Sequence, residues 1–343
     1  MIRTQGLTKD FVVSRTETVH AVRGIDLEVA PGELVAVLGP NGAGKTTTMR
    51  MLTTLIRPTS GTAEVAGLDV AQDAASVRRR IGYVGQGNGA GHTQRVRDEL
   101  VVQGVVYGLD RRSAARRAGE LLDALDLAEL ARRKVADLSG GQRRRLDVAL
   151  GLVHAPGLLF LDEPSTGLDP HNRANLWEHI MRLRAEHDMT IMLTTHYLDE
   201  ADSMAERVVV VDHGQVIADD TADGLKRDLA GDRLVVEAGG GGDRSVAAVE
   251  RLVRIVHAQP GARDVSVDGV RVTARVADSA GAVPEVVRAA AAQGVAVVRA
   301  QGYAPTLDDV FLALTGRSLR ESAATQHTGT TDREAGLAGE DAA

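Results

Sequence analysis

The chain of 343 residues contains no cysteine and very few aromatic residues. The absence of cysteine excludes disulfides, cysteine-ligated zinc and thiol chemistry. Phenylalanine, tryptophan and tyrosine make up only 2% of the residues, so the interior has to be built from aliphatic side chains. The apolar share of 43% is sufficient for a packed core. The length is sufficient for more than one domain.

Lysine and long apolar runs are also scarce, and acidic residues outnumber basic ones. A net charge of −7 argues against a nucleic-acid partner. No apolar run reaches the roughly 18 residues that a membrane span needs, and the N-terminus lacks the apolar segment of a signal peptide. We therefore expect a cytoplasmic protein. The only lysines are Lys9, Lys45, Lys134 and Lys226.

The chain divides into three regions. Residues 1–230 alternate apolar runs with helix-like segments, which predicts an α/β domain with a largely parallel sheet and a helical insert over 87–157. Residues 231–316 follow the order β-α-β-β-α-β, which is typical of a small α+β, ferredoxin-like domain. We expect a regulatory or dimerisation role for it. Residues 317–343 are rich in small and polar residues and are expected to be disordered.

A phosphate-binding loop is predicted by GPNGAGKT, residues 39–46, between an apolar strand and a helix. Its glycines allow the backbone to wrap phosphate oxygens, Lys45 adds a charge for the β- and γ-phosphates, and the Thr46 hydroxyl can bind Mg²⁺. The alternative is an ordinary glycine-rich turn. The nucleotide-binding residues predicted here are Gly39, Pro40, Asn41, Gly42, Ala43, Gly44, Lys45, Thr46 and Thr47.

Two adjacent carboxylates end the apolar run LLFLDEP, residues 158–164. Acids at the end of a buried strand are costly unless they have a function, although a solvated strand end would also accommodate them. Asp162 is placed to reach the magnesium ion of a P-loop nucleotidase. Glu163 points the other way and can polarise a water in line with the γ-phosphate.

The stretch LSGGQRRRL, residues 138–146, begins a helix. Ser139 is a suitable N-cap, and Gln142 completes a capping-box spacing. A capping box does not require Gly140 and Gly141, which expose backbone N–H groups at the positive end of the helix. This geometry binds anions, yet the stretch has neither a lysine nor a metal ligand of its own.

The ordered set of motifs over residues 1–225 resembles the ATP-binding-cassette (ABC) ATPases. By resemblance, LSGGQ is the signature, and it binds, in trans, the γ-phosphate held by the P-loop of a second copy in a head-to-tail homodimer. The resemblance also implies ATP and Mg²⁺ as cofactors. Four further residues take family roles: Gln86 in the Q-loop as a catalytic and metal-binding residue, Asp169 in the D-loop, His196 as the switch histidine, and Phe11 stacking on the base.

The C-terminal stretch TLDDVFLALTG, residues 306–316, resembles a motif of the daunorubicin/doxorubicin-resistance type of ABC ATPase. This implies an ATPase that energises antibiotic efflux through a separate integral-membrane permease, on the inner face of the membrane. The ATPase of a lipid or polysaccharide exporter and a soluble non-transport ABC ATPase are the alternatives. Phe311 needs a packing partner in its own domain, in the ATP-binding domain or in a second copy. The glycine-rich segment after Gln86 departs from the family pattern.

Overall fold

The computed structural model describes residues 1–87, 89–239 and 243–316. The described chain forms two compact units, Met1–Asp219 and a second unit that begins at Asp220. This division falls earlier than the boundary predicted at residue 230. The predicted tail, residues 317–343, and the run of glycines at 240–242 lie outside the described residues.

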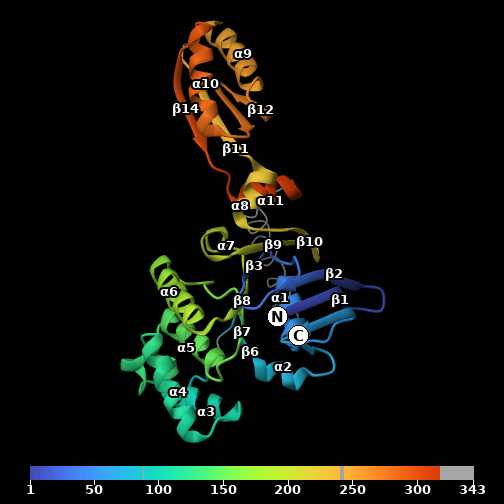
Figure 1. Cartoon of the computed structure of the whole chain (residues 1–343), viewed down its shortest axis with the longest axis vertical. Helices are drawn as coiled ribbons and strands as arrows, with labels where there is room; N and C mark the ends of the chain where they lie inside the picture. The colour runs from blue at the N-terminus through green and yellow to red at the C-terminus, as the bar shows by residue number, and fades with distance from the viewer. Residues whose placement is uncertain (88, 240–242, 317–343) are drawn as a thin grey trace, which may run out of the picture. The chain divides into compact units, whose positions relative to one another are not determined.

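The first unit is built on a largely parallel sheet, as predicted (Figure 1). β3 pairs with β8 and β9, and β7 pairs with β6 and β8, all in parallel. β3, β7 and β8 are buried along their whole length, which explains their continuous apolar sequences. The strand order is β10 (Gln215–Asp220), β9 (Arg207–Asp212), β3 (Leu34–Leu38), β8 (Thr190–Thr195), β7 (Leu158–Asp162) and β6 (Ile81–Val84).

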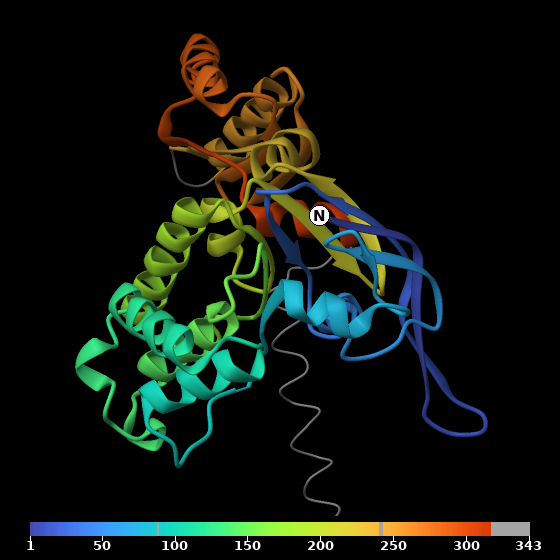
Figure 2. The same cartoon turned by 60° about the horizontal axis from the view of Figure 1, so that its bottom comes forward.

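The helices of the predicted insert lie on one side of this sheet (Figures 1 and 2). Among them, α5 packs on α6, and α3 and α4 pack on each other and on α5. Two short 3₁₀ turns, η1 (Ala128–Leu130) and η2 (Val135–Asp137), connect α4 to α5. The helices of the unit are α1 (Lys45–Leu52), α2 (Ala74–Arg80), α3 (Val96–Val106), α4 (Arg111–Ala124), α5 (Gly140–Leu152), α6 (Pro170–His187) and α7 (Leu198–Met204).

An antiparallel sheet, which the sequence analysis did not predict, completes the first unit. Its buried residues share one core with α1 and the P-loop strand β3. The pairing of β1 with β2 is interrupted by register shifts that break the period of two expected of a strand. In the order of pairing, the strands are β2 (Thr18–Val29), β1 (Ile2–Val12), β4 (Ser60–Val65) and β5 (Leu68–Asp69).

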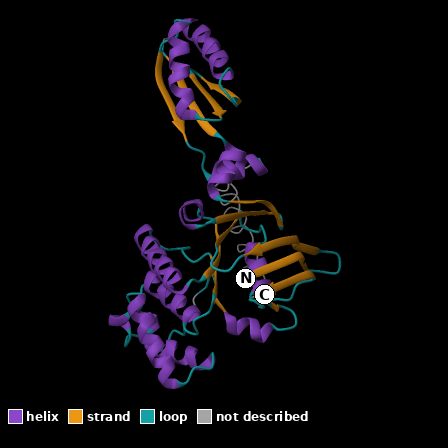
Figure 3. Cartoon of the chain, in the orientation of Figure 1, coloured by secondary structure: helices purple, strands orange, loops and turns teal. Residues whose placement is uncertain are grey.

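The second unit contains an antiparallel sheet covered by helices (Figure 3). The inward residues of β11 and β13 form one core with the apolar faces of α9 and α10. The element order is β-α-β-β-α-β, the order read from the sequence: β11 (Asp232–Ala238), α9 (Asp243–His257), β12 (Arg263–Asp268), β13 (Arg271–Val276), α10 (Ser279–Ala292) and β14 (Val297–Tyr303).

The last helix, α11 (Leu307–Thr315), packs on α8 (Ala222–Leu225) and the adjoining π-helical turn η3 (Lys226–Ala230) at the start of the same unit. A capping box between Thr306 and Asp309 begins α11, and Asp309 also pairs with Arg275 of β13. Phe311 is fully buried. The helix that carries it packs on residues 222–230, which belong to the unit that begins at Asp220 and which the sequence analysis had placed in the ATP-binding domain.

Candidate functional site

The phosphate-binding loop connects β3 to α1 in a conformation that only glycine adopts without strain. Gly42 has φ 79° and Gly44 has φ 102°. A Cβ atom on Gly44 would lie 2.5 Å from the carbonyl oxygen of Ala21, and one on Gly39 would lie 2.2 Å from that of Val211. No side chain caps α1, so the first-turn N–H groups at its positive end remain available to an anion.

Lys45 folds back over this loop. Its Nζ donates to the carbonyl oxygens of Gly39 at 2.6 Å and Pro40 at 3.0 Å. Burial lowers the pKa of Lys45, and the nearby carboxylates of Glu163 and Asp162 oppose that shift. The ammonium group is thus held at the loop by backbone dipoles and acidic neighbours, in the position from which a lysine reaches nucleotide phosphates.

Asp162, Thr46 and Gln86 form a cluster suited to a divalent cation. The Oδ1 atom of Asp162 accepts from the hydroxyls of Thr46 at 3.0 Å and Thr194 at 2.7 Å. Its Oδ2 atom is buried and has no hydrogen-bond partner within the described part of the chain. The amide of Gln86 donates to the Thr46 hydroxyl at 3.2 Å. An unpaired carboxylate oxygen beside a hydroxyl and an amide matches the oxygen ligands that Mg²⁺ prefers.

Glu163 turns away from this cluster toward His196. It has φ 47°, and its N–H donates to the carbonyl and the hydroxyl of Thr194, each at 3.1 Å. Its Oε2 atom lies 3.3 Å from Nδ1 of His196 and accepts from Thr166 at 3.2 Å. The imidazole of His196 beside it lowers the pKa of Glu163 against the effect of burial, so this carboxylate is ionised at neutral pH.

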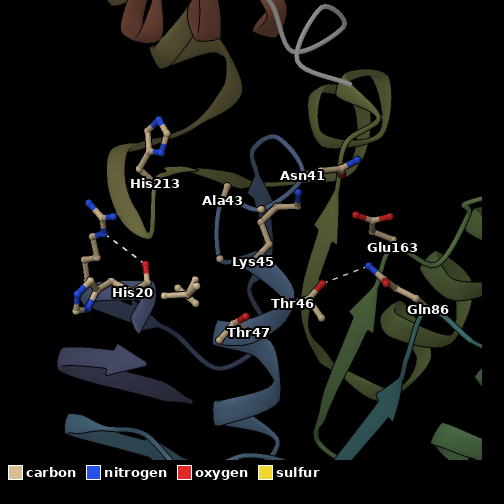
Figure 4. A pocket seen from close by; sticks show the side chains of 14 residues that line it. His20, Asn41, Ala43, Lys45, Thr46, Thr47, Gln86, Glu163 and His213 are labelled. Atoms are coloured by element: carbon tan, nitrogen blue, oxygen red, sulfur yellow. Dashed lines mark hydrogen bonds between the residues drawn. The ribbon is translucent and has the colours of Figure 1, made fainter. Parts of the chain in front are cut away.

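Lys45, Thr46, Gln86 and Glu163 border a cavity of about 690 Å³ (Figure 4). Asp162 and His196 lie outside its lining and contact it through Thr46 and Glu163. Gln86 and Glu163 lie on one side of Lys45 and Thr46, and His20 and His213 lie on the other. Of the predicted nucleotide-binding residues in the loop, Asn41–Thr47 line the cavity. Gly39 and Pro40 do not line it, but their carbonyl oxygens accept hydrogen bonds from Lys45. The lining residues that the sequence analysis missed are Val19, His20, Ala21, Arg23 and His213.

Of the missed residues, His213 carried a signal in the sequence, whereas His20 and Arg23 did not. His213 follows β9, the neighbour of the P-loop strand, and parallel strands bring their carboxyl ends to one edge. The backbone links the same places: Gly214 donates to the Ala43 carbonyl at 2.9 Å and accepts from the Arg23 N–H at 2.8 Å. His20 and Arg23 carry no local signal, because only the fold of β2 brings them to the loop.

Phe11 is not among the lining residues. It is 40% exposed, lies under the ammonium group of Lys9, and pairs across the strands with Val19, which does line the cavity. Its predicted role in stacking on the base stays a prediction.

The signature residues Ser139, Gly140, Gly141 and Gln142 also lie outside the lining of this cavity. The predicted capping box at the start of α5 is present: Ser139 accepts from the Gln142 N–H, and Gln142 accepts from the Ser139 N–H. Packing within its own chain also favours glycine at position 141, since a Cβ atom there would lie 2.5 Å from Oδ1 of Asn172. Asp169 caps α6 by accepting from the N–H of Asn172.

Comparisons with known proteins agree with this geometry. Residues 22–166 match the family model described as "ABC transporter". The daunorubicin resistance ATP-binding protein DrrA2 of Streptomyces coeruleorubidus is 43% identical over 92% of this chain and 95% of its own. The daunorubicin/doxorubicin resistance ATP-binding protein DrrA of Streptomyces peucetius is 41% identical over 94% of this chain and 96% of its own.

Among solved structures, a dimeric ATP-binding cassette in a post-hydrolysis state, bound to ADP and Pi, has a TM-score of 0.60. The match covers 64% of this chain and 98% of that one at 24% identity, which supports the fold. The sequence relatives extend over nearly the full length and include the second unit. The chain therefore belongs to the ATP-binding proteins of ABC transporters, in the daunorubicin/doxorubicin-resistance group.

Proposed function

We propose that this chain binds ATP with Mg²⁺ at the P-loop cavity and hydrolyses it to drive export of an antibiotic or another hydrophobic compound. The observation that carries the proposal is the pair of adjacent acids at the end of β7. Among the described residues, one buried oxygen of Asp162 beside Thr46 has no hydrogen-bond partner, whereas Glu163 lies against His196 on the other side. One acid is placed to hold a metal ion and the other to act as a base.

The chain's own residues divide the chemistry between them. The loop N–H groups and Lys45 bind the phosphates, and Thr46, Asp162 and Gln86 would hold Mg²⁺. When bound, Mg²⁺ neutralises charge that develops on the phosphate oxygens. Glu163 accepts a proton from the attacking water, and His196 orients the Glu163 carboxylate.

A head-to-tail homodimer would complete each site. The signature residues 139–142 lie outside the cavity of their own chain, and they present a helix N-terminus with exposed glycine at Gly140. In the dimer they would bind the γ-phosphate held by the second copy. Two equivalent sites then fit a twofold axis.

The export function requires an integral-membrane permease, and it places the chain on the inner face of the cell membrane. Among the described residues, no helix is both long enough and apolar enough to cross a bilayer. The names of the daunorubicin-resistance relatives favour a drug as cargo over a lipid or polysaccharide. Drug accumulation in cells with and without the chain and its permease would test the cargo; unchanged accumulation would favour the alternative cargo class.

The catalytic part of the proposal is tested with Lys45→Ala. Removing the charge at the β- and γ-phosphates should abolish binding of a fluorescent ATP analogue as well as phosphate release. Lys134→Ala is the matched control, because Lys134 is exposed and lies far along the chain from the loop. Unchanged ATP affinity in Lys45→Ala would refute the assignment of the loop.

A further inference from the structure

A buried arginine on α5 donates hydrogen bonds to the backbone around two of the predicted catalytic residues, Gln86 and Glu163. Arg144 donates from Nε to the carbonyl of Pro164, and from Nη1 to that of Gly85 at 2.6 Å. Its Nη2 atom lies 3.4 Å from the carbonyl oxygens of Asp162 and Glu163. One guanidinium group therefore joins the residue before Gln86 to the end of β7 that carries Glu163.

A buried aspartate one turn further along α5 holds the other flank of Gln86. The Oδ1 atom of Asp147 accepts from the N–H groups of Gly89 at 2.9 Å and Ala90 at 3.2 Å. These residues lie within the glycine-rich segment after Gln86 that departs from the family pattern. The chain on both sides of Gln86 is thus held to one helix, at Gly85 by Arg144 and at Gly89 and Ala90 by Asp147.

The spacing of these residues places them on one stripe of α5. Positions 140, 144 and 147 follow the i, i+4, i+7 pattern of a single helix face. The helix spans Gly140–Leu152 without a proline, and it begins at the signature cap. A helix of this kind moves as one body, so a displacement of its first turn reaches both charged side chains.

Structural packing alone does not account for these two residue types. Both side chains are almost fully buried, and burying a charge costs free energy unless the group is paired and hydrogen-bonded. Burial lowers the pKa of Arg144 and raises that of Asp147, and each residue opposes the shift of the other. A more apolar helix face would pack as well without this cost, but it would not hold the loop on both sides of Gln86.

We infer that Arg144 and Asp147 are positioning residues that couple the signature helix to Gln86 and Glu163 of the same chain. The inference rests on the proposed function. When the first turn of α5 closes on a γ-phosphate held by a second copy, the two side chains carry that movement to the Q-loop and to the end of β7. Occupation of one ATP site then adjusts the catalytic residues of the other.

The coupling is tested by hydrogen exchange in the Glu163→Gln background, where turnover is blocked. Addition of Mg²⁺-ATP should slow exchange over residues 85–90 in the parent as its dimer forms. Arg144→Lys keeps the charge but replaces the planar fork of donors with a single ammonium group. The Arg144→Lys variant should keep the ATP affinity and the dimer mass of the parent. It should lose most of the ATP-dependent slowing of hydrogen exchange over residues 85–90.

The matched control is Arg143→Lys, the same substitution one residue earlier. Arg143 donates to the carbonyls of Val135 and Ala136, away from the Q-loop. It should retain the slowing of exchange at residues 85–90. Full slowing in Arg144→Lys, or an equal loss in both variants, would overturn the inference. A parent that binds no ATP or forms no dimer would instead overturn the proposed function.

A second variant, which keeps the shape of the side chain, tests whether Asp147 acts through Gln86. Asp147→Asn is isosteric and keeps an acceptor, but it weakens the charge-assisted bonds to Gly89 and Ala90. In otherwise unchanged protein it should lower kcat by about ten- to hundredfold, the effect of losing a group that orients a metal-binding residue. In a Gln86→Ala background it should lower kcat little further, because its action passes through Gln86. Multiplicative losses in the double variant would contradict the inference.

Discussion

Glu163 occupies a strained backbone position that separates the functions of two neighbouring acids. A non-glycine residue in the left-handed region costs about 1–2 kcal/mol, and such strain is concentrated at functional sites. Here Thr194 holds the turn through two bonds to the Glu163 N–H. The turn sends Asp162 toward Thr46 and Glu163 toward His196, so consecutive residues serve as metal ligand and base.

Glu163→Gln should bind ATP and form the ATP-dependent dimer, yet hydrolyse ATP at least about a hundredfold more slowly. The amide keeps the shape of the carboxylate but cannot accept a proton from water. Phosphate release and sedimentation with ATP measure the two properties. The control is Glu186→Gln on the exposed side of α6, which should behave as the parent. Near-normal turnover in Glu163→Gln would remove Glu163 from its role.

His196→Ala should shift the acid limb of the pH profile of kcat to higher pH. The imidazole of His196, 3.3 Å from the Glu163 carboxylate, is the main cause that lowers the pKa of Glu163. Without it, burial raises this pKa, and the carboxylate is protonated at a pH where the parent still has its base. Steady-state hydrolysis across pH measures the limb.

The matched control for this profile is His187→Ala, since His187 lies exposed at the end of α6. It should leave the acid limb where the parent has it. A limb that stays in place or moves to lower pH in His196→Ala would show that His196 does not hold the Glu163 carboxylate in its ionised form.

At the scale of elements, local motifs made the parallel sheet and the P-loop predictable. β3, β7 and β8 are continuous apolar runs that end in recognisable polar residues, so sequence alone locates the edge where they meet. The antiparallel sheet was missed because bulges in β1 disrupt its alternation. The hydrogen bonds from α5 to the residues around Gln86 could not be predicted from the sequence either, because the bonded residues are 57 to 59 positions apart.

Phe311→Ala should destabilise the second unit and leave ATP binding intact. Phe311 is fully buried, and truncating a buried phenylalanine typically removes about 3–5 kcal/mol of unfolding free energy. The P-loop cavity lies wholly within Met1–Asp219. Urea unfolding followed by circular dichroism, with an ATP titration on the same sample, measures both effects.

Leu312→Ala is the neighbouring control, because Leu312 is 42% exposed and its truncation should change stability by only about 0.5 kcal/mol. A folded Phe311→Ala variant with normal stability but weaker ATP-driven dimerisation would contradict this expectation. It would support the regulatory or dimerisation role that the sequence predicted for residues 231–316.

At the scale of the whole molecule, the nucleotide chemistry and the small unit are separate modules. The predicted catalytic and metal-binding residues all belong to Met1–Asp219. Across the described residues, no group of three or more histidine and acidic side chains is arranged to hold a metal ion. The second unit instead offers a sheet with two helices and a capped terminal helix, α11.

The chain should sediment with membranes only when its permease partner is present. The proposed export function requires attachment to that partner. Fractionation of cells that express the chain with and without the candidate permease, followed by a high-salt wash, measures the attachment. Lys45→Ala serves as the control for nucleotide dependence. If ATP-driven closure strengthens the contact between the chain and its permease, this variant should attach more weakly than the parent. If that contact does not depend on nucleotide, the two should attach equally. Firm attachment in the absence of any permease would contradict the proposal, because it would require an anchor in the chain itself.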